Sequence, residues 1–160
     1  MKPGQRPFGT TRNGQPVTAV TIAGGELSAT LLTYGATLQD LRLAGTPWPL
    51  TLGSDTLAAY EGPMRYFGAI AGPVANRIAG AAAVIGNRTF RLDPNEGGRT
   101  TLHGGSTGTG GQVWQIASVS DSFVTLELAL PDCQGGFPGH RHLSATYSIS
   151  GQSTLRLELT

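Results

Sequence analysis

Three short segments of this 160-residue sequence combine glycine with a side chain that can hydrogen-bond or stack, and they are the first candidates for chemistry. Asn76 and Arg77 place an amide beside a planar guanidinium, and together these can donate several hydrogen bonds to vicinal hydroxyl groups such as those of a sugar. His103 precedes two glycines, so the backbone around it can approach a ligand closely while the imidazole donates or accepts a proton. The three segments are Gly68–Ile78, Thr101–Gly105 and Gly135–Gly139.

Each of these features also has an ordinary structural explanation. An isolated Asn-Arg pair is in most proteins a turn amide next to a surface ion-pair partner, and a His before Gly-Gly is usually a loop residue. The run Gly136–Gly139, read alone, is typical of a tight turn with an anchoring aromatic ring. None of the three segments is specific when it is taken singly.

Metal and thiol chemistry are disfavoured by what surrounds the candidate ligands. On a strand, His140 and His142 would share a face and could join His103 around a metal, but no fourth ligand stands at a recognisable spacing. Arg141 adds positive charge between the two histidines. Cys133 carries no sequence sign of an activated nucleophile, so we interpret it as an incidental thiol. We expect no metal site.

The elements that must position these residues are predicted to be strands. Apolar and polar residues alternate with period two, most clearly over Val124–Leu130 and Leu155–Thr160, which places successive side chains on opposite faces of a sheet. Further strands are expected at Val17–Ile22, Glu26–Leu32, Ala36–Leu43, Arg88–Leu92, Val113–Val119 and Leu143–Ile149.

Turn signals between these segments favour antiparallel hairpins. Glycine-containing turns are expected at Ala23–Gly25, Ile85–Asn87 and Ser150–Gln152, each joining a pair of strands. Only Asp55–Tyr60 and Val74–Ile78 are interpreted as short helices, because no long stretch holds a 3.6-residue period with caps. The pattern therefore predicts an all-β sandwich or barrel.

Composition and charge narrow the class of partner. Charged residues make up only 13% of the chain, while it contains 24 glycines and 10 prolines, which suits short strands and many turns. The formal net charge of +1 gives no sign of the basic surface that binds nucleic acid. No segment approaches the ~20 apolar residues that would span a membrane. A single cysteine fits a reducing compartment, so a cytoplasmic location is expected.

Taken in order, the segments resemble the N-terminal half of the aldose 1-epimerase (galactose mutarotase) family. The resemblance extends over roughly residues 10–160, and this serial agreement is far more specific than any one motif. The matching pieces are Leu32–Leu38, Leu52–Tyr60, Tyr66–Ala69, Ala75–Ala79, Leu102–Gly105, Trp114 and Gly136–Gly139.

The resemblance implies an antiparallel β-sandwich of the galactose mutarotase type, with a sugar held in an open cleft on one sheet. Asn76 and Arg77 match the family's sugar-binding Asn-Arg, and His103 matches its first substrate-contacting histidine, which could also contribute to catalysis. The implied activity interconverts the α and β anomers of aldohexoses such as glucose and galactose, without a cofactor. The family's principal acid, a second His in an Asn-His-x-Tyr-Phe-Asn type motif, and its Glu base find no counterpart here.

Residues 1–160 are therefore expected to be the N-terminal portion of one sandwich domain, without its C-terminal portion. The last strand pattern runs into Thr160 with no stop signal, which would leave an unpaired edge. The chain alone is expected to be catalytically inactive, and its exposed apolar side chains to favour self-association or a completing polypeptide. Two alternatives stay open: a non-catalytic carbohydrate-binding β-module, and a hexose-phosphate epimerase in which Arg65 and Arg77 would receive phosphate.

Overall fold

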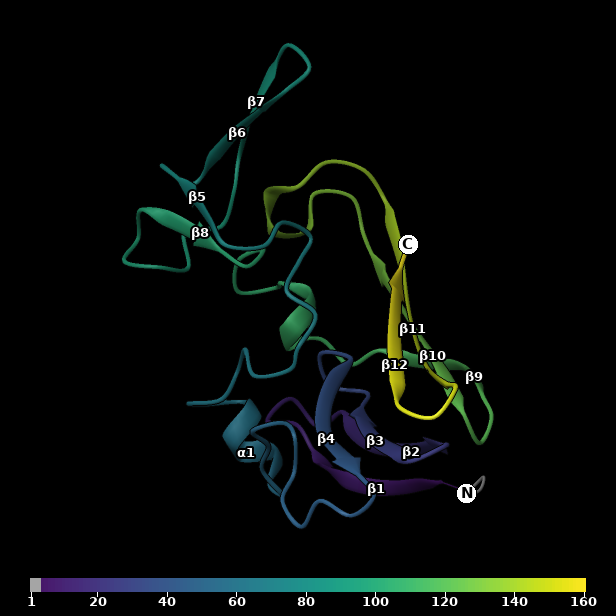
Figure 1. Ribbon diagram of the computed structural model, residues 1–160. Coiled ribbons are helices and arrows are strands. Elements are labelled where there is room, and N and C mark those ends of the chain that lie inside the picture. The colour runs from purple at the N-terminus through teal and green to yellow at the C-terminus, as the bar shows by residue number, and fades with distance from the viewer. Residues whose placement is uncertain (1–3) are drawn as a thin grey trace.

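The computed structural model describes residues 4–160 and consists mainly of two four-stranded antiparallel sheets (Figure 1). The N-terminal sheet follows chain order, β1-β2-β3-β4, and successive strands are joined by short connections. Its strands are β1 (Gln5–Thr10), β2 (Pro16–Gly24), β3 (Leu27–Leu32) and β4 (Thr37–Leu43).

The C-terminal sheet is also a meander, with the spatial order β12-β11-β10-β9. It rises past the edge of the N-terminal sheet, and the C-terminus lies at the upper end of β12 (Figure 1). Its strands are β9 (Gln115–Val119), β10 (Phe123–Leu130), β11 (Arg141–Ser150) and β12 (Thr154–Leu159).

The segment between the sheets forms two small ribbons that project away from the sandwich (Figure 1). In one ribbon β5 (Arg77–Ala79) pairs with β8 (Thr100–Leu102), and in the other β6 (Ala82–Ile85) pairs with β7 (Arg88–Arg91). The only α-helix in residues 4–160 is the four-residue α1 (Leu57–Tyr60), so no helix there is long and apolar enough to cross a membrane. Two 3-10 turns, at Thr109–Gly111 and Gln134–Gly136, complete the described elements.

The core fills the space where the two sheets face each other. Alternation decides which side chains enter it: on β10, Val124, Leu126 and Leu130 are buried, as their period-two spacing predicts. They pack with side chains of the other sheet, among them Val20 and Leu31. The arrangement is the β-sandwich that the sequence predicts.

A buried hydrogen bond joins the two sheets across the core. The hydroxyl of Tyr147 on β11 donates to the carbonyl oxygen of Ala36 over 2.9 Å, and burial raises the pKa of that hydroxyl. Replacing Tyr147 with Phe should lower the free energy of unfolding by about 1–3 kcal/mol, because the Ala36 carbonyl would remain buried without this donor. Urea unfolding followed by circular dichroism measures the change, and an unaltered midpoint would contradict it.

All the predicted strands are confirmed within two residues at each end, and the short helix near Tyr60 and the three glycine turns are confirmed as well. The predicted helix at Val74–Ile78 is wrong. Asn76 has a φ of 66°, which a right-handed helix cannot contain, and β5 begins at the next residue. No residue ranges were predicted for strands β1, β5, β6 and β8.

Candidate functional site

The residues on either side of the β5–β8 ribbon form the centre of the candidate site. Arg77 is the first residue of β5 and pairs with Leu102, the last residue of β8, so Asn76 and His103 meet at the open end of the ribbon. The N–H of His103 donates to the carbonyl oxygen of Asn76 over 3.0 Å, and the N–H of Asn76 donates to His103 Nδ1 over 3.0 Å. Each residue therefore orients the other.

Both residues adopt a left-handed backbone, with φ of 66° at Asn76 and 51° at His103. This region costs free energy for residues other than glycine, although Asn and His are among the side chains that enter it more readily. Such backbone strain persists only where surrounding contacts fix it, and it is often found at functional sites. Because His103 Nδ1 accepts the N–H of Asn76, a neutral His103 ring carries its proton on Nε2.

A glycine-rich loop after His103 packs against the residues that lead into β5. A Cβ added at Gly104 would overlap the carbonyl of Gly72, so a larger residue would force the two segments apart. The loop is also bonded to Asp93, whose carboxylate accepts hydrogen bonds from the hydroxyl and the N–H of Ser106. Both hydrogen bonds lower the pKa of Asp93, and the one from the hydroxyl has the larger effect.

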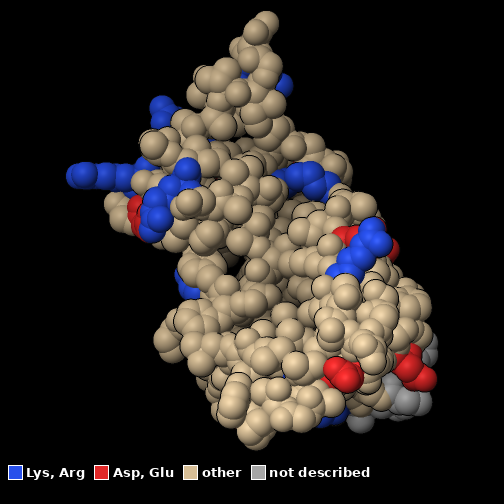
Figure 2. All heavy atoms as spheres, in the orientation of Figure 1, with Lys and Arg blue, Asp and Glu red and all other residues tan. Residues whose placement is uncertain are grey.

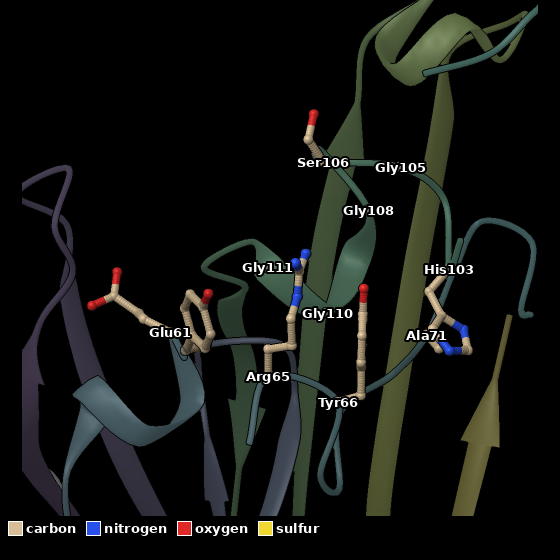
Figure 3. Close-up of a pocket in the computed structure, with 11 residues that line it drawn as sticks. Glu61, Arg65, Tyr66, Ala71, His103, Gly105, Ser106, Gly108, Gly110 and Gly111 are labelled. Carbon is tan, nitrogen blue, oxygen red and sulfur yellow. The ribbon is translucent and has the colours of Figure 1, made fainter. Parts of the chain in front are cut away.

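A pocket of about 200 Å³ opens beside His103 (Figure 3). Along one wall the Arg65 guanidinium lies 4.8 Å from the ring centre of Tyr66, and the Tyr66 ring lies 4.6 Å from that of His103. Glu61 stands on the side away from His103 (Figure 3), and its negative charge adds to burial in raising the pKa of Tyr34. The volume is below the roughly 300 Å³ at which small-molecule pockets usually begin.

The guanidinium of Arg77 is held by a carboxylate from the loop before β8. Its Nε and Nη2 donate to the two oxygens of Glu96, each over 2.7 Å, and its Nη1 lies 3.4 Å from Asn76 Oδ1. The hydrogen bond to Glu96 raises the pKa of Arg77, and the hydrogen bond from Arg77 lowers the pKa of Glu96. Both side chains are partly exposed, so solvent screens their attraction.

The structure thus brings together the three residues that the sequence singled out, Asn76, Arg77 and His103. The other histidines lie elsewhere: His140 precedes β11, and His142 Nε2 lies 3.7 Å from a carboxylate oxygen of Glu127 on β10. No three His, Cys, Asp or Glu side chains within residues 4–160 gather as metal ligands would.

The remaining candidate residue, Cys133, is exposed on the turn before β11. The hydrogen bond and the charge of Asp132 raise the pKa of its thiol, which disfavours the reactive thiolate. No contact of Cys133 points to a chemical role.

Sequence reasoning missed Asn95, Glu96 and Tyr66. Asn95 and Glu96 lie in a loop flanked by proline and glycine, which reads as a plain turn, and their partners are recognisable only after β5 and β8 have paired. Tyr66 lies inside one of the segments that carry the family resemblance, but nothing in its neighbours indicates that it stacks on His103.

These observations define the class of protein. It is a two-sheet antiparallel sandwich with a polar pocket at the loops between its sheets. The family model for aldose 1-epimerase matches residues 18–160. Galactose mutarotase from Mus musculus is 30% identical over 141 residues, and a probable aldose 1-epimerase from Arthroderma benhamiae is 29% identical over 161 residues. The chain belongs to the aldose 1-epimerase family.

Solved structures agree with this assignment. A galactose 1-epimerase from Lactobacillus acidophilus superimposes with a TM-score of 0.82 at 25% identity, covering 97% of this chain and 46% of that one. A GalM/aldose epimerase homologue from C. elegans gives 0.81 at 30% identity, covering 88% and 44%. The mouse match covers 86% of this chain but only 41% of the mouse protein. The fungal match covers 94% of this chain but only 36% of the fungal protein.

Proposed function

We propose that this chain supplies the sugar-binding part of an aldose 1-epimerase that interconverts the α and β anomers of aldohexoses such as glucose and galactose. The observation that carries the proposal is the joint placement of Asn76, Arg77 and His103 in a chain of this family. Their amide, guanidinium and imidazole groups offer several donors to neighbouring hydroxyls, which suits a neutral sugar. A cytoplasmic location stays a prediction from the single cysteine.

Anomer exchange needs two proton carriers. A base removes the proton of the O1 hydroxyl while an acid protonates the ring oxygen, the C1–O5 bond opens, rotation about C1–C2 presents the other carbonyl face, and closure reverses the transfers. In this scheme His103 serves through Nε2–H, because its Nδ1 is already bonded to the Asn76 N–H. It can therefore donate to a sugar oxygen, and a neutral ring in this tautomer cannot accept a proton from O1 at the same atom.

The base and the principal acid are proposed to come from residues outside this chain. They would lie in a further portion of the same sandwich domain or in a completing polypeptide, which is consistent with the share of the relatives that the chain spans. The isolated chain would then bind sugar without catalysing anomer exchange.

Two measurements on the isolated chain test the proposal. In an NMR titration with D-galactose we expect saturable shifts of the Asn76 and His103 amides, and polarimetry of freshly dissolved α-D-galactose should show no acceleration over buffer. Replacing Arg77 with Gln should weaken galactose binding by roughly tenfold, because a hydrogen bond from the guanidinium to a sugar hydroxyl is lost. Arg156→Gln is the matched control, since Arg156 is bonded to Glu158 on the distant β12.

Either of two results would contradict the proposal. Wild-type chain that does not bind galactose would remove the sugar-binding role. Acceleration of mutarotation by the chain alone would show that residues 1–160 already contain a complete acid and base.

A further inference from the structure

Glu96 is the one carboxylate that contacts the proposed sugar-binding residues within residues 4–160. It accepts from two nitrogens of Arg77 at equal distances of 2.7 Å, which is the parallel two-bond geometry that fixes a guanidinium in a plane. On the face shown in Figure 2 charged groups are few, and acidic atoms lie directly against basic ones beside the projecting ribbons. The Arg77–Glu96 pair is the one ion pair among the described residues that includes a proposed sugar-binding residue.

The backbone holds Glu96 in place independently of its side chain. The N–H of Glu96 donates to the carbonyl of Thr100 over 3.0 Å, and the N–H of Thr100 donates back over 3.2 Å. Next to it, the side chain of Asn95 accepts from the N–H of Leu102 over 2.7 Å and donates to its carbonyl over 3.0 Å. Because Leu102 precedes His103 and Arg77 faces Leu102, this loop is attached to both sides of the site.

The contact determines which donors of Arg77 stay free. A guanidinium has five N–H groups, and two of them are directed at Glu96. A third, on Nη1, is directed at Asn76 Oδ1 over 3.4 Å, so one hydrogen on Nη1 and one on Nη2 can still bond to hydroxyl groups. The positive charge, however, is largely cancelled by the adjacent carboxylate, so a second anion would meet Glu96 as well as Arg77.

We propose that Glu96 is a positioning and specificity-determining residue: it fixes the plane of Arg77 and, by cancelling its charge, makes the site select neutral sugars over anionic ones such as uronates and sugar phosphates. This inference rests on the proposed function, since it presumes that Arg77 contacts the sugar. It also disfavours the part of the hexose-phosphate alternative that assigns phosphate to Arg77, because that one of the two arginines is already paired.

The Arg77 hydrogen bond lowers the pKa of Glu96, so the carboxylate stays ionised throughout the neutral range. A group whose pKa is lower in the folded state stabilises the fold above its ordinary pKa. That contribution disappears as the pH falls through the lowered value. The pairing is therefore in place at the pH at which sugars would be bound.

The test compares Glu96→Gln with Glu158→Gln in the full chain. Glu158 is the matched control because it bonds Arg156 in a similarly exposed pair, with side-chain exposures of 54% and 63% against 36% and 58% for Glu96 and Arg77. NMR titrations use D-galactose and D-galacturonate as probes. We expect Glu96→Gln to weaken galactose binding and to strengthen galacturonate binding, each by roughly threefold to tenfold, while Glu158→Gln changes neither.

A third variant separates orientation from charge. Glu96→Asp keeps the negative charge but shortens the reach, so galactose binding should weaken while the preference for the neutral sugar persists. A structural role alone would change affinity for both sugars in the same direction and would not reverse the preference.

The outcomes distinguish a failure of this inference from a failure of the proposed sugar-binding function. If wild-type chain binds galactose and Glu96→Gln leaves the ratio of the two affinities unchanged, Glu96 does not set specificity, and the sugar-binding proposal survives. If wild-type chain binds neither sugar, the proposed function fails and the role of Glu96 fails with it.

Discussion

Replacing Trp114 with Ala should lower the free energy of unfolding by about 3–5 kcal/mol, a large share of the roughly 5–15 kcal/mol that holds a typical domain folded. The indole is 1% exposed and belongs to the core between the sheets. Its Nε1–H also donates to the carbonyl of Thr109 over 3.1 Å, so the substitution removes apolar packing and leaves that carbonyl without this donor. Urea unfolding followed by far-ultraviolet circular dichroism measures the loss without relying on the indole signal.

Trp48→Ala is the control for this measurement. Trp48 has the same side chain but is 64% exposed, so its removal should change the midpoint very little. Equal midpoints for the two variants would show that Trp114 does not carry the packing that its burial indicates.

We expect the wild-type chain to self-associate through β12, and we expect replacement of Leu157 and Leu159 together with Thr to make it more monomeric. On β12 every second residue is a leucine, so the leucines share one face of the strand. Leu155 packs against the core, but Leu157 and Leu159 are 41% and 56% exposed. Covering each would contribute about 1–2 kcal/mol, so two chains gain by burying these side chains against each other. Threonine keeps the strand propensity while it removes most of the apolar area.

Light scattering after size-exclusion chromatography, over a range of protein concentrations, reads out the association. Val84→Thr is the control, because Val84 is also exposed but lies on the projecting β6–β7 hairpin. Wild-type chain that stays monomeric at every concentration would contradict the expectation that β12 drives association.

The parts of the fold that could be predicted from sequence are those whose side chains alternate against the core. β10 was recognisable because Val124, Leu126, Leu128 and Leu130 all enter the core. β1 was not, because it contains Pro7 and Gly9, which are unusual in strands, and its register shifts between them. Strands β5 and β8 have only three residues each, which is too short for alternation to be seen.

The candidate site was only partly readable for a different reason. Asn76, Arg77 and His103 could be named because their neighbours carry a family resemblance, not because their own types are rare. Glu96 could not be named, because its role depends on a contact that exists only when β5 and β8 are side by side. The left-handed backbone at Asn76 was likewise invisible, which is why the helix predicted over it was wrong.

The hydrogen bonds of the site join residues closer in sequence than the bond that connects the two sheets. Asn76 and His103 are 27 positions apart and Arg77 and Glu96 are 19 apart, whereas the bond from Tyr147 to Ala36 spans 111. The two sets of contacts meet at Thr109, which lies between two glycines that line the pocket, and whose carbonyl accepts from Trp114 Nε1 while its N–H donates to the carbonyl of Gly72. A substitution that weakens the core at Trp114 is therefore expected to change the shape of the pocket loop as well as the fraction of folded molecules, and its effect on ligand affinity should not add independently to that of a site substitution.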